Sequence, residues 1–129
     1  MQIKFTSVLV EDQEHALQFY TTVLGFQKMA DLPIGEYRWL TVTSADGVEG
    51  VVLVLEPMGF PPAREYQKAL FDAGIPATDF VTDDIRADYE HLKSLGVVFR
   101  NEPVDMGPIV GATFEDTCSN LIQLVQPKV

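Results

Sequence analysis

Hydrophobic and polar residues follow one another along the chain in two series that have the same order. The first series opens with an alternating stretch over residues 2–10, which predicts a strand. From Asp12 to Gly25, apolar residues recur at helical spacing. Because Asp is a favoured helix N-cap and Gly a favoured residue just after a helix, this pattern predicts a helix between them. Three further strands are predicted, over residues 26–30, 37–44 and 50–56.

The second series repeats this plan. A strand is predicted over residues 77–82, and a helix that begins at Asp83 or Asp84 and ends at Gly96. Counted from Asp83, the helix signals are thirteen residues apart, as they are in the first series. Sequence identity between the halves is slight, so the repeat rests on the order of elements and on their end signals. Three strands again complete the series, over residues 97–101, 109–114 and 121–126.

A short helix is predicted between the two series, starting at Pro61 and stopping at Gly74. We expect an α+β fold in one domain over residues 1–129, because the chain has room for one hydrophobic core. The expected parts are a first βαβββ module over residues 1–57, a connecting helix within 58–76 and a second βαβββ module over 77–129.

The charge of the chain narrows the classes of partner. Nineteen acidic residues against nine basic ones give a formal net charge of −10, which disfavours nucleic acid and anionic membrane surfaces. No apolar run approaches the roughly 20 residues of a membrane-spanning helix. The N-terminus shows no signal-peptide pattern. Cys118 is the single cysteine, so no internal disulfide is expected, and we predict a cytoplasmic protein.

Several short motifs resemble those of one superfamily. In the first half they are Val8-Leu9-Val10-Glu11-Asp12, Ala16-Leu17-Gln18-Phe19-Tyr20 and Val23-Leu24-Gly25-Phe26. In the second half they are Val81, Asp83, Leu92, Leu95 and Gly96, then Phe114-Glu115-Asp116 and Asn120-Leu121-Ile122-Gln123-Leu124-Val125. The chain therefore resembles the vicinal oxygen chelate superfamily, which includes glyoxalase I, bleomycin-resistance proteins and extradiol dioxygenases. The resemblance implies curled mixed sheets around a cleft and a homodimer.

In metal-dependent members of that superfamily, four ligands lie on the first and last strands of the two halves. Carried over to this sequence, these positions fall on Phe5, Val52, Thr78 and Gln123, with the Val52 strand fixed only to within a residue or two. Phenyl and isopropyl groups offer no lone pair, Thr78 is a weak neutral donor, and Gln123 alone is a plausible ligand. A catalytic metal site normally needs about three protein ligands, so no metal or other cofactor is predicted.

Other donors are placed less well for a metal. His15 and His91 fall in the predicted helices, and a lone Glu56 binds a transition metal poorly. Asp79 faces the cleft only if the strand register slips by one residue, because neighbouring residues of a strand point to opposite faces. Cys118 lies among acidic neighbours, which disfavour a reactive thiolate.

The remaining cleft residues indicate binding rather than acid–base catalysis. No titratable pair clearly converges, and no catalytic residue is assigned. An apolar pocket with a few neutral polar groups suits a small aromatic or amphipathic molecule, with Trp39 available for stacking, although the same residues are also ordinary core material. The predicted ligand-binding residues are Phe5, Ser7, Trp39, Thr41, Val52, Thr78, Phe80 and Gln123.

Three functions remain open at this point. The first is a metal-free binder of a small-molecule ligand. The second is a divergent lyase, isomerase or dioxygenase of the same superfamily, with a divalent metal held by an unforeseen ligand set such as Gln123 with Glu56 or Asp79. The third is a non-catalytic dimeric interaction module.

Overall fold

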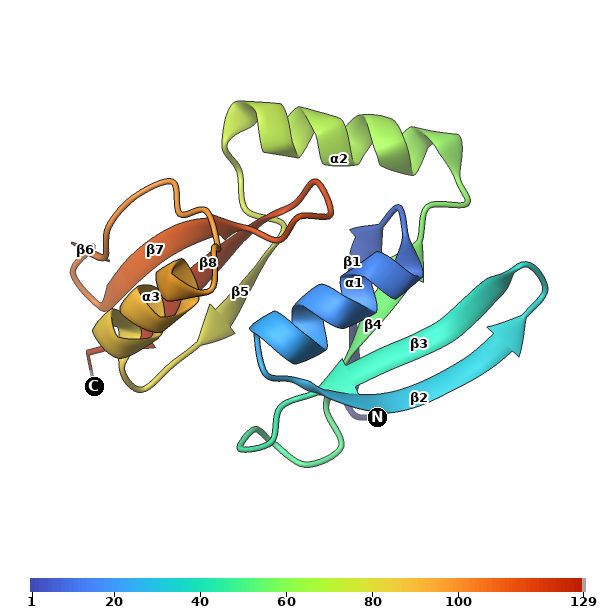
Figure 1. Ribbon diagram of the computed structural model, residues 1–129, viewed down its shortest axis with the longest axis horizontal. Coiled ribbons are helices and arrows are strands. Elements are labelled where there is room, and N and C mark those ends of the chain that lie inside the picture. Colours follow the sequence, from blue (N-terminus) through green and yellow to red (C-terminus); the bar gives the residue numbers. More distant parts are fainter. Residues whose placement is uncertain (129) are drawn as a thin grey trace. The chain divides into compact units, whose positions relative to one another are not determined.

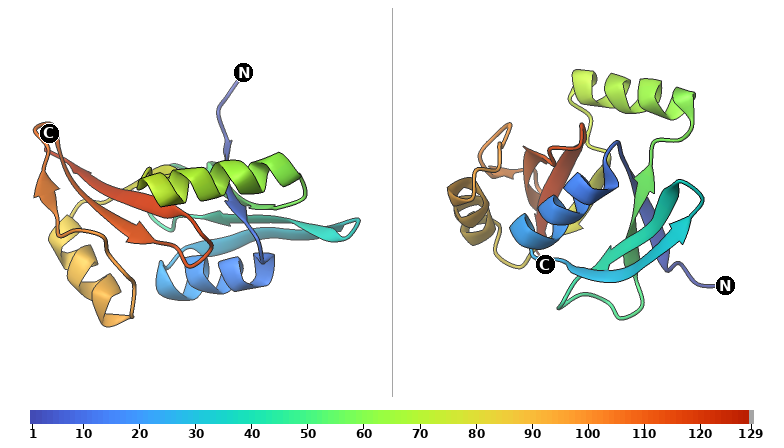
Figure 2. Two further views of the ribbon diagram at one scale, coloured as in Figure 1. Left: turned by 90° about the horizontal axis from the view of Figure 1, so that it is seen from above. Right: turned by 45° about the vertical axis from the view of Figure 1, so that its right-hand side comes forward.

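The first half of the chain forms a mixed four-stranded sheet with the strand order β1-β4-β3-β2 (Figure 1). In the computed structural model, which describes residues 1–128, the parallel pair is β1 (Phe5–Val10) and β4 (Val52–Pro57). The other two strands, β2 (Gln27–Ile34) and β3 (Tyr37–Thr43), form an antiparallel hairpin that extends well beyond β4 (Figure 2). Pro33 is tolerated in β2 because this strand is an edge of the sheet.

The first helix begins where the sequence predicts. The side chain of Asp12 accepts a hydrogen bond from the backbone N–H of His15, which caps α1 (Gln13–Gln18). The helix then widens into a π-helical turn, η1 (Phe19–Val23), where the hydroxyl of Thr21 donates to the carbonyl of Leu17 at 2.6 Å. Gly25 follows with a φ of +83°, a left-handed conformation that ends the helix.

One face of the first sheet packs against α1. Strand residues of one parity carry branched apolar side chains that point at the helix and are almost fully buried. They are Val8, Val10, Leu40, Val42, Leu53 and Leu55. The helix contributes Ala16, Leu17 and Tyr20 to this core. We call the opposite side of the sheet, turned away from α1, the far face of the first sheet.

The second half repeats the topology with the strand order β5-β8-β7-β6. Its strands are β5 (Thr78–Val81), β6 (Val104–Asp105), β7 (Ile109–Glu115) and β8 (Leu121–Pro127). β5 and β8 are parallel and the other pairs are antiparallel, as in the first sheet. Helix α3 (Ile85–Ser94) is capped by Asp84, whose carboxylate accepts from the N–H of Ala87. The predicted α+β fold of two βαβββ modules is confirmed.

The strand predicted over residues 97–101 is wrong. This segment lies beside β7 and makes one isolated bridge, Phe99 with Phe114. The backbone pairing ends at Asn101, whose side-chain oxygen accepts a hydrogen bond from the backbone N–H of Thr113. That N–H is then not available for a backbone hydrogen bond between the two segments. Pro103 then has no N–H to offer, so the third strand of this half is the short β6 instead.

Helix α2 (Pro61–Ala73) lies between the two modules in the chain. The chain divides into two compact units, residues 1–65 and the part from Tyr66 onward, with the division inside α2. In the second unit, the buried amide of Gln67 donates to the carbonyl of Cys118 and to the side chain of Asn120. Val129, the last residue of the predicted second module, lies outside the described residues.

None of the helices within residues 1–128 has the length and apolar character needed to cross a membrane.

Candidate functional site

The far face of the first sheet brings together five of the predicted site residues. In the parallel pair, Phe5 lies beside Val52, and Ser7 lies one row further on, beside Val54. In the antiparallel pair, Thr41 also lies beside Val54, which places Trp39 on the same face by alternation. Phe5, Ser7, Trp39, Thr41 and Val52 therefore share one surface, as the alternation of the sequence predicts.

An aromatic pair spans this face. The rings of Phe5 and Trp39 meet edge to face, with centroids 5.6 Å apart and planes at 87°. The two residues lie in different rows, so their side chains lean toward each other across the row that holds Val54 and Thr41. Both of those residues are buried, whereas Phe5 keeps 63% of its surface exposed and Trp39 is half-buried. The face thus presents aromatic rings above a sheet of small apolar and hydroxyl side chains.

The second sheet separates residues that we expected to be neighbours. Thr78 lies beside Ile122 and Phe80 beside Leu124, while Gln123 lies beside Asp79. Thr78 and Phe80 therefore share the face that carries Ile122, and Gln123 points to the other side. The expectation that Thr78, Phe80 and Gln123 line one surface is wrong.

Helix α3 covers the face that carries Thr78 and Phe80. The backbone N–H of Ile85 donates to the side chain of Gln126, two residues beyond Leu124 on the same side of β8. Tyr89 of α3 contacts Phe99, which in turn contacts the buried Phe114. Asp79 and Gln123 belong to the opposite side, which we call the far face of the second sheet.

The two observed helix N-caps show which residues of this chain occupy the four metal-ligand positions that were carried over from the superfamily. Asp12 and Asp84 are equivalent N-caps, so the counterpart of Phe5 is Ala77, since each lies seven residues before its cap. Thr78 is thus one residue away from the equivalent position, and a shift of one residue turns a side chain to the other face.

The same comparison revises the second position. The residue five before each cap is Ser7 in the first module and Asp79 in the second. Asp79 lies beside Gln123, and Ser7 lies beside Val54. The counterpart of Gln123 is therefore Val54 rather than Val52. The four positions are Phe5, Val54, Ala77 and Gln123, and only the amide of Gln123 carries a donor atom, so these four side chains do not fit a metal.

The far face of the second sheet is more polar. Asp79 and Gln123 lie side by side, and Met106 reaches over Gln123 with 3.8 Å between its sulfur and the amide nitrogen. A side chain at Gly111 would come within 3.0 Å of that sulfur and 3.2 Å of that amide, so glycine leaves the room that both occupy.

The loop that carries Met106 is held by an ion pair. The carboxylate of Asp105 accepts from the ammonium of Lys128 at 2.7 Å and from the N–H of Gly107 at 2.9 Å. The hydrogen bond from Lys128, and to a lesser extent that from Gly107, hold the pKa of Asp105 below its ordinary value. Residues 103–108 thus include the strand β6 and are anchored at Asp105.

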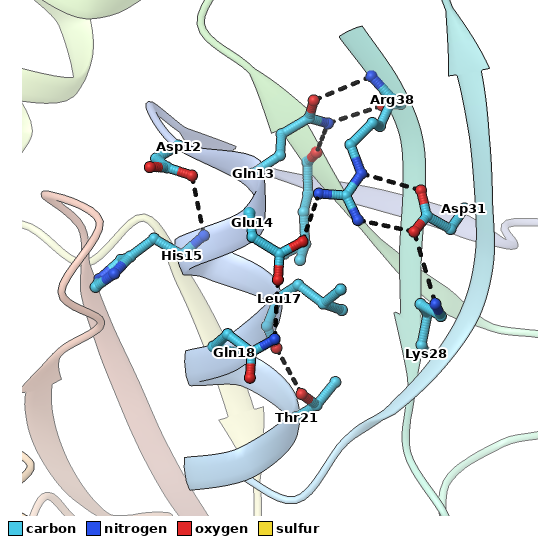
Figure 3. Close-up of polar contacts among 11 residues, drawn as sticks. Asp12, Gln13, Glu14, His15, Leu17, Gln18, Thr21, Lys28, Asp31 and Arg38 are labelled. Carbon is cyan, nitrogen blue, oxygen red and sulfur yellow. Dashed lines mark hydrogen bonds and ion pairs between the residues drawn. The ribbon is translucent and has the colours of Figure 1, made fainter.

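A polar network on the helix side of the first sheet was not foreseen from the sequence (Figure 3). The buried amide of Gln13 donates to the carbonyls of Arg38 at 2.7 Å and Leu55 at 2.9 Å, and accepts the N–H of Arg38 at 3.0 Å. Beyond the pair Thr41 and Val54, β3 and β4 separate, and the amide of Gln13 replaces the direct backbone hydrogen bonds between these two strands. No motif marks this role, because a polar residue in a first helical turn is usually exposed.

The guanidinium of Arg38 completes this network. It makes two parallel hydrogen bonds to Asp31, of 2.7 and 3.0 Å, and one of 2.9 Å to Glu14. The bonds from Arg38 lower the pKa of Asp31 and raise that of Arg38, while Gln18 and then Arg38 lower the pKa of Glu14. These charges are already paired with one another, so they serve the structure of the hairpin.

Other candidate donors lie apart. His15 and His91 are exposed on α1 and α3, and Cys118 is buried in the turn that Gln67 contacts. Within residues 1–128, no three His, Cys, Asp or Glu side chains gather in a group suited to a metal ion.

Comparison with known proteins agrees with this architecture. The family model described as "Glyoxalase/Bleomycin resistance protein/Dioxygenase superfamily" matches residues 2–124, and the chain belongs to that superfamily. It is 51% identical over 126 residues to the uncharacterised protein YurT of Bacillus subtilis (strain 168), covering 98% of this chain and 99% of YurT.

Two solved structures are similar over almost their whole length. One is UcmS2, with a TM-score of 0.84 and 32% identity over 97% of both chains. The other is TnmS3, described as an antibiotic binding protein from Streptomyces sp. CB03234, with a TM-score of 0.78 and 31% identity over 99% of this chain and 97% of that one.

Proposed function

We propose that this protein binds a small aromatic or amphipathic molecule without the help of a metal. The observation that carries the proposal is the edge-to-face pair of Phe5 and Trp39 on the far face of the first sheet. The exposed ring of Phe5 and the half-buried ring of Trp39 offer stacking to a flat ligand, and the exposed hydroxyl of Ser7 offers a neutral hydrogen bond. The similarity to TnmS3, an antibiotic binding protein, supports a small-molecule ligand.

The far face of the second sheet, taken by itself, is a second proposed contact surface for a ligand. Gln123 is retained from the residues predicted from sequence, and Asp79 joins it because the two lie side by side. Thr78 and Phe80 drop out of the proposed contact set because they lie on the side covered by α3.

The chemistry of the four superfamily positions supports the metal-free part of the proposal. Phe5, Val54 and Ala77 end in carbon, and a single amide at Gln123 falls short of the roughly three ligands that a catalytic site uses. Elemental analysis of protein purified without chelator tests this directly. We expect clearly less than one equivalent of any transition metal per chain. A stoichiometric metal that Asp79→Asn and Gln123→Ala remove would instead establish the metal-dependent lyase, isomerase or dioxygenase.

Trp39 provides the readout for binding because it is the single tryptophan. A library of aromatic and amphipathic compounds is screened by thermal shift, and each hit is titrated while Trp39 fluorescence is excited selectively. We expect stabilisation together with quenching or a spectral shift. Trp39→Leu lacks this fluorophore and is titrated by calorimetry; it should weaken the hits about tenfold, in line with the loss of a stacking contact of about 1.4 kcal/mol. Phe60→Leu, a matched change at an exposed aromatic outside the sheets, should leave them unchanged. Failure of every compound to stabilise the protein would refute the proposal.

We further propose that this protein works as a homodimer in the cytoplasm. Its β2–β3 hairpin exposes a group of large apolar side chains, namely Met29, Leu32, Ile34 and Tyr37. Such a group is typical of a protein–protein contact. Light scattering after size exclusion should give twice the chain mass, and Leu32→Asp should convert the dimer to monomer. Val48→Asp, which adds the same charge at an exposed loop position, is the control. A monomeric wild-type protein at micromolar concentration would exclude the dimer.

A further inference from the structure

Charge is distributed very unevenly between the two faces of the first sheet. The helix side holds Lys28, Asp31 and Arg38, which pair with each other and with Glu14. On the far face the described strand residues are uncharged, with a single exception. They are Phe5, Ser7 and Leu9 of β1, Gln27, Ala30, Leu32 and Ile34 of β2, Tyr37, Trp39, Thr41 and Thr43 of β3, and Val52, Val54 and Glu56 of β4. The exception is the carboxylate of Glu56.

Glu56 differs from the paired carboxylates of this chain. Its side chain is half-buried at the end of β4, beside Leu9 of β1. Within residues 1–128 it makes no hydrogen bond or ion pair, whereas Glu14, Asp31 and Glu115 all contact an arginine. An unpaired carboxylate on an otherwise uncharged face is free to pair with a cation, because opposite charges a few ångströms apart attract each other.

Trp39 shares the far face with this carboxylate. Thr41 lies beside Val54, and Trp39 and Glu56 each lie two residues further along their strands, so both point to the same side of the sheet. At this point the amide of Gln13 is inserted between the carbonyls of Arg38 and Leu55, which holds the two strands apart. Trp39 and Glu56 therefore belong to the same face at the end of the sheet where β3 and β4 separate, and the indole meets the ring of Phe5 edge to face.

We propose that the ligand of the far face of the first sheet is a cation. Its chemical class is an aromatic or amphipathic molecule with a protonated amine or quaternary ammonium group. Glu56 neutralises that group, and the face of Trp39 attracts it through the ring quadrupole, for which tryptophan is the strongest side chain. The net charge of −10 favours the approach of such a ligand over that of an anion. This inference rests on the proposed binding function and adds the charge of the ligand to it.

Three phenols of similar size test the charge separately from the binding. They are 3-(trimethylammonio)phenol, its neutral isostere 3-tert-butylphenol, and the anion 3-hydroxybenzenesulfonate, each titrated against Trp39 fluorescence. We expect the cation to bind the wild-type protein about tenfold more tightly than the isostere, the size of a partly desolvated cation–π and carboxylate contact. The anion should bind more weakly than either.

Variants assign the preference to Glu56. Glu56→Gln should reduce the cation-to-isostere ratio to within about twofold of unity and leave the affinity for 3-tert-butylphenol unchanged. Glu65→Gln removes the same charge from an exposed position on α2 and should keep the full ratio. Circular dichroism checks that both variants fold.

The outcomes separate the two proposals. Equal binding of the cation and its isostere, or a ratio that survives Glu56→Gln, overturns the inference about charge while the binding function stands. Absence of binding by all three phenols, together with a failed thermal-shift screen, overturns both.

Discussion

Replacement of Gln13 should destabilise the protein more than any other exchange of an uncharged polar residue in α1. Its amide makes three hydrogen bonds, of 2.7, 2.9 and 3.0 Å, to backbone groups of Arg38 and Leu55. Each such bond contributes about 1 kcal/mol, and backbone groups left without a partner in a buried place cost about 1–3 kcal/mol each. Gln13→Ala should therefore lower the free energy of unfolding by about 3 kcal/mol.

The expected shift in melting temperature follows from the size of the chain. The entropy of unfolding is about 2.1 cal/mol/K per residue, or roughly 0.27 kcal/mol/K for a chain of 129 residues that unfolds together. A loss of about 3 kcal/mol then corresponds to about 11 °C. Urea unfolding followed by circular dichroism gives the free energy, and calorimetry gives the melting temperature.

Two further variants isolate the hydrogen bonds. Gln13→Met keeps the length and most of the packing of the side chain but none of its hydrogen bonds, so it should lose almost as much stability as Gln13→Ala. Gln18→Ala removes an amide on the same helix whose bond to Glu14 is exposed, and it should change the free energy by less than about 0.5 kcal/mol. If Gln13→Met were as stable as wild type, the reasoning about the separated strands would be refuted.

Three other predictions concern stability. Arg38 depresses the pKa of Asp31 in the folded state, so the stabilisation by this ion pair is complete above the unfolded pKa and is lost as the pH falls through the folded pKa. Melting curves are measured between pH 6 and 2, a range that spans the unperturbed Asp pKa of about 3.9. The melting temperature of Asp31→Asn should fall less steeply with acid than that of the wild-type protein. Gly25→Ala should lose about 1–2 kcal/mol in urea unfolding from backbone conformation alone, since φ is +83° and no atom lies within 4 Å of the added methyl; an unchanged midpoint would contradict this. Phe114→Ala should cost about 3–5 kcal/mol by the same measurement because the ring is 1% exposed, and a loss below about 1 kcal/mol would mean that the site is not packed.

Local signals in the sequence determined the elements of this protein and their order. Asp12, Gly25 and Gly96 act through their own backbone and nearest neighbours, so their roles as caps and stops are readable without a partner segment. The alternation of β1 likewise separated Phe5 and Ser7 from the core face, because side chains of a strand point to opposite sides whatever it pairs with. These features are enough to define two βαβββ modules.

Contacts between distant segments decided the rest. Thr78 lies only one residue beyond the position equivalent to Phe5, yet this places it on the face covered by α3, and the pairing of β5 with β8 brings Asp79 beside Gln123 instead. In the same way, only the pairing of β1 with β4 identifies Val54 as the counterpart of Gln123. The alternation of a strand shows which of its residues share a face of the sheet, but not which residues of the neighbouring strand lie beside them.

The roles of Gln13 and Glu56 belong wholly to the tertiary structure. Gln13 matters because its amide reaches carbonyls 25 and 42 residues away, where β3 and β4 separate. Glu56 becomes a candidate contact because it shares a face with Trp39, and this face otherwise has no charge among its described strand residues. Hydrogen bonding and electrostatics depend on distances in space, which sequence spacing does not encode beyond one helical turn or one strand.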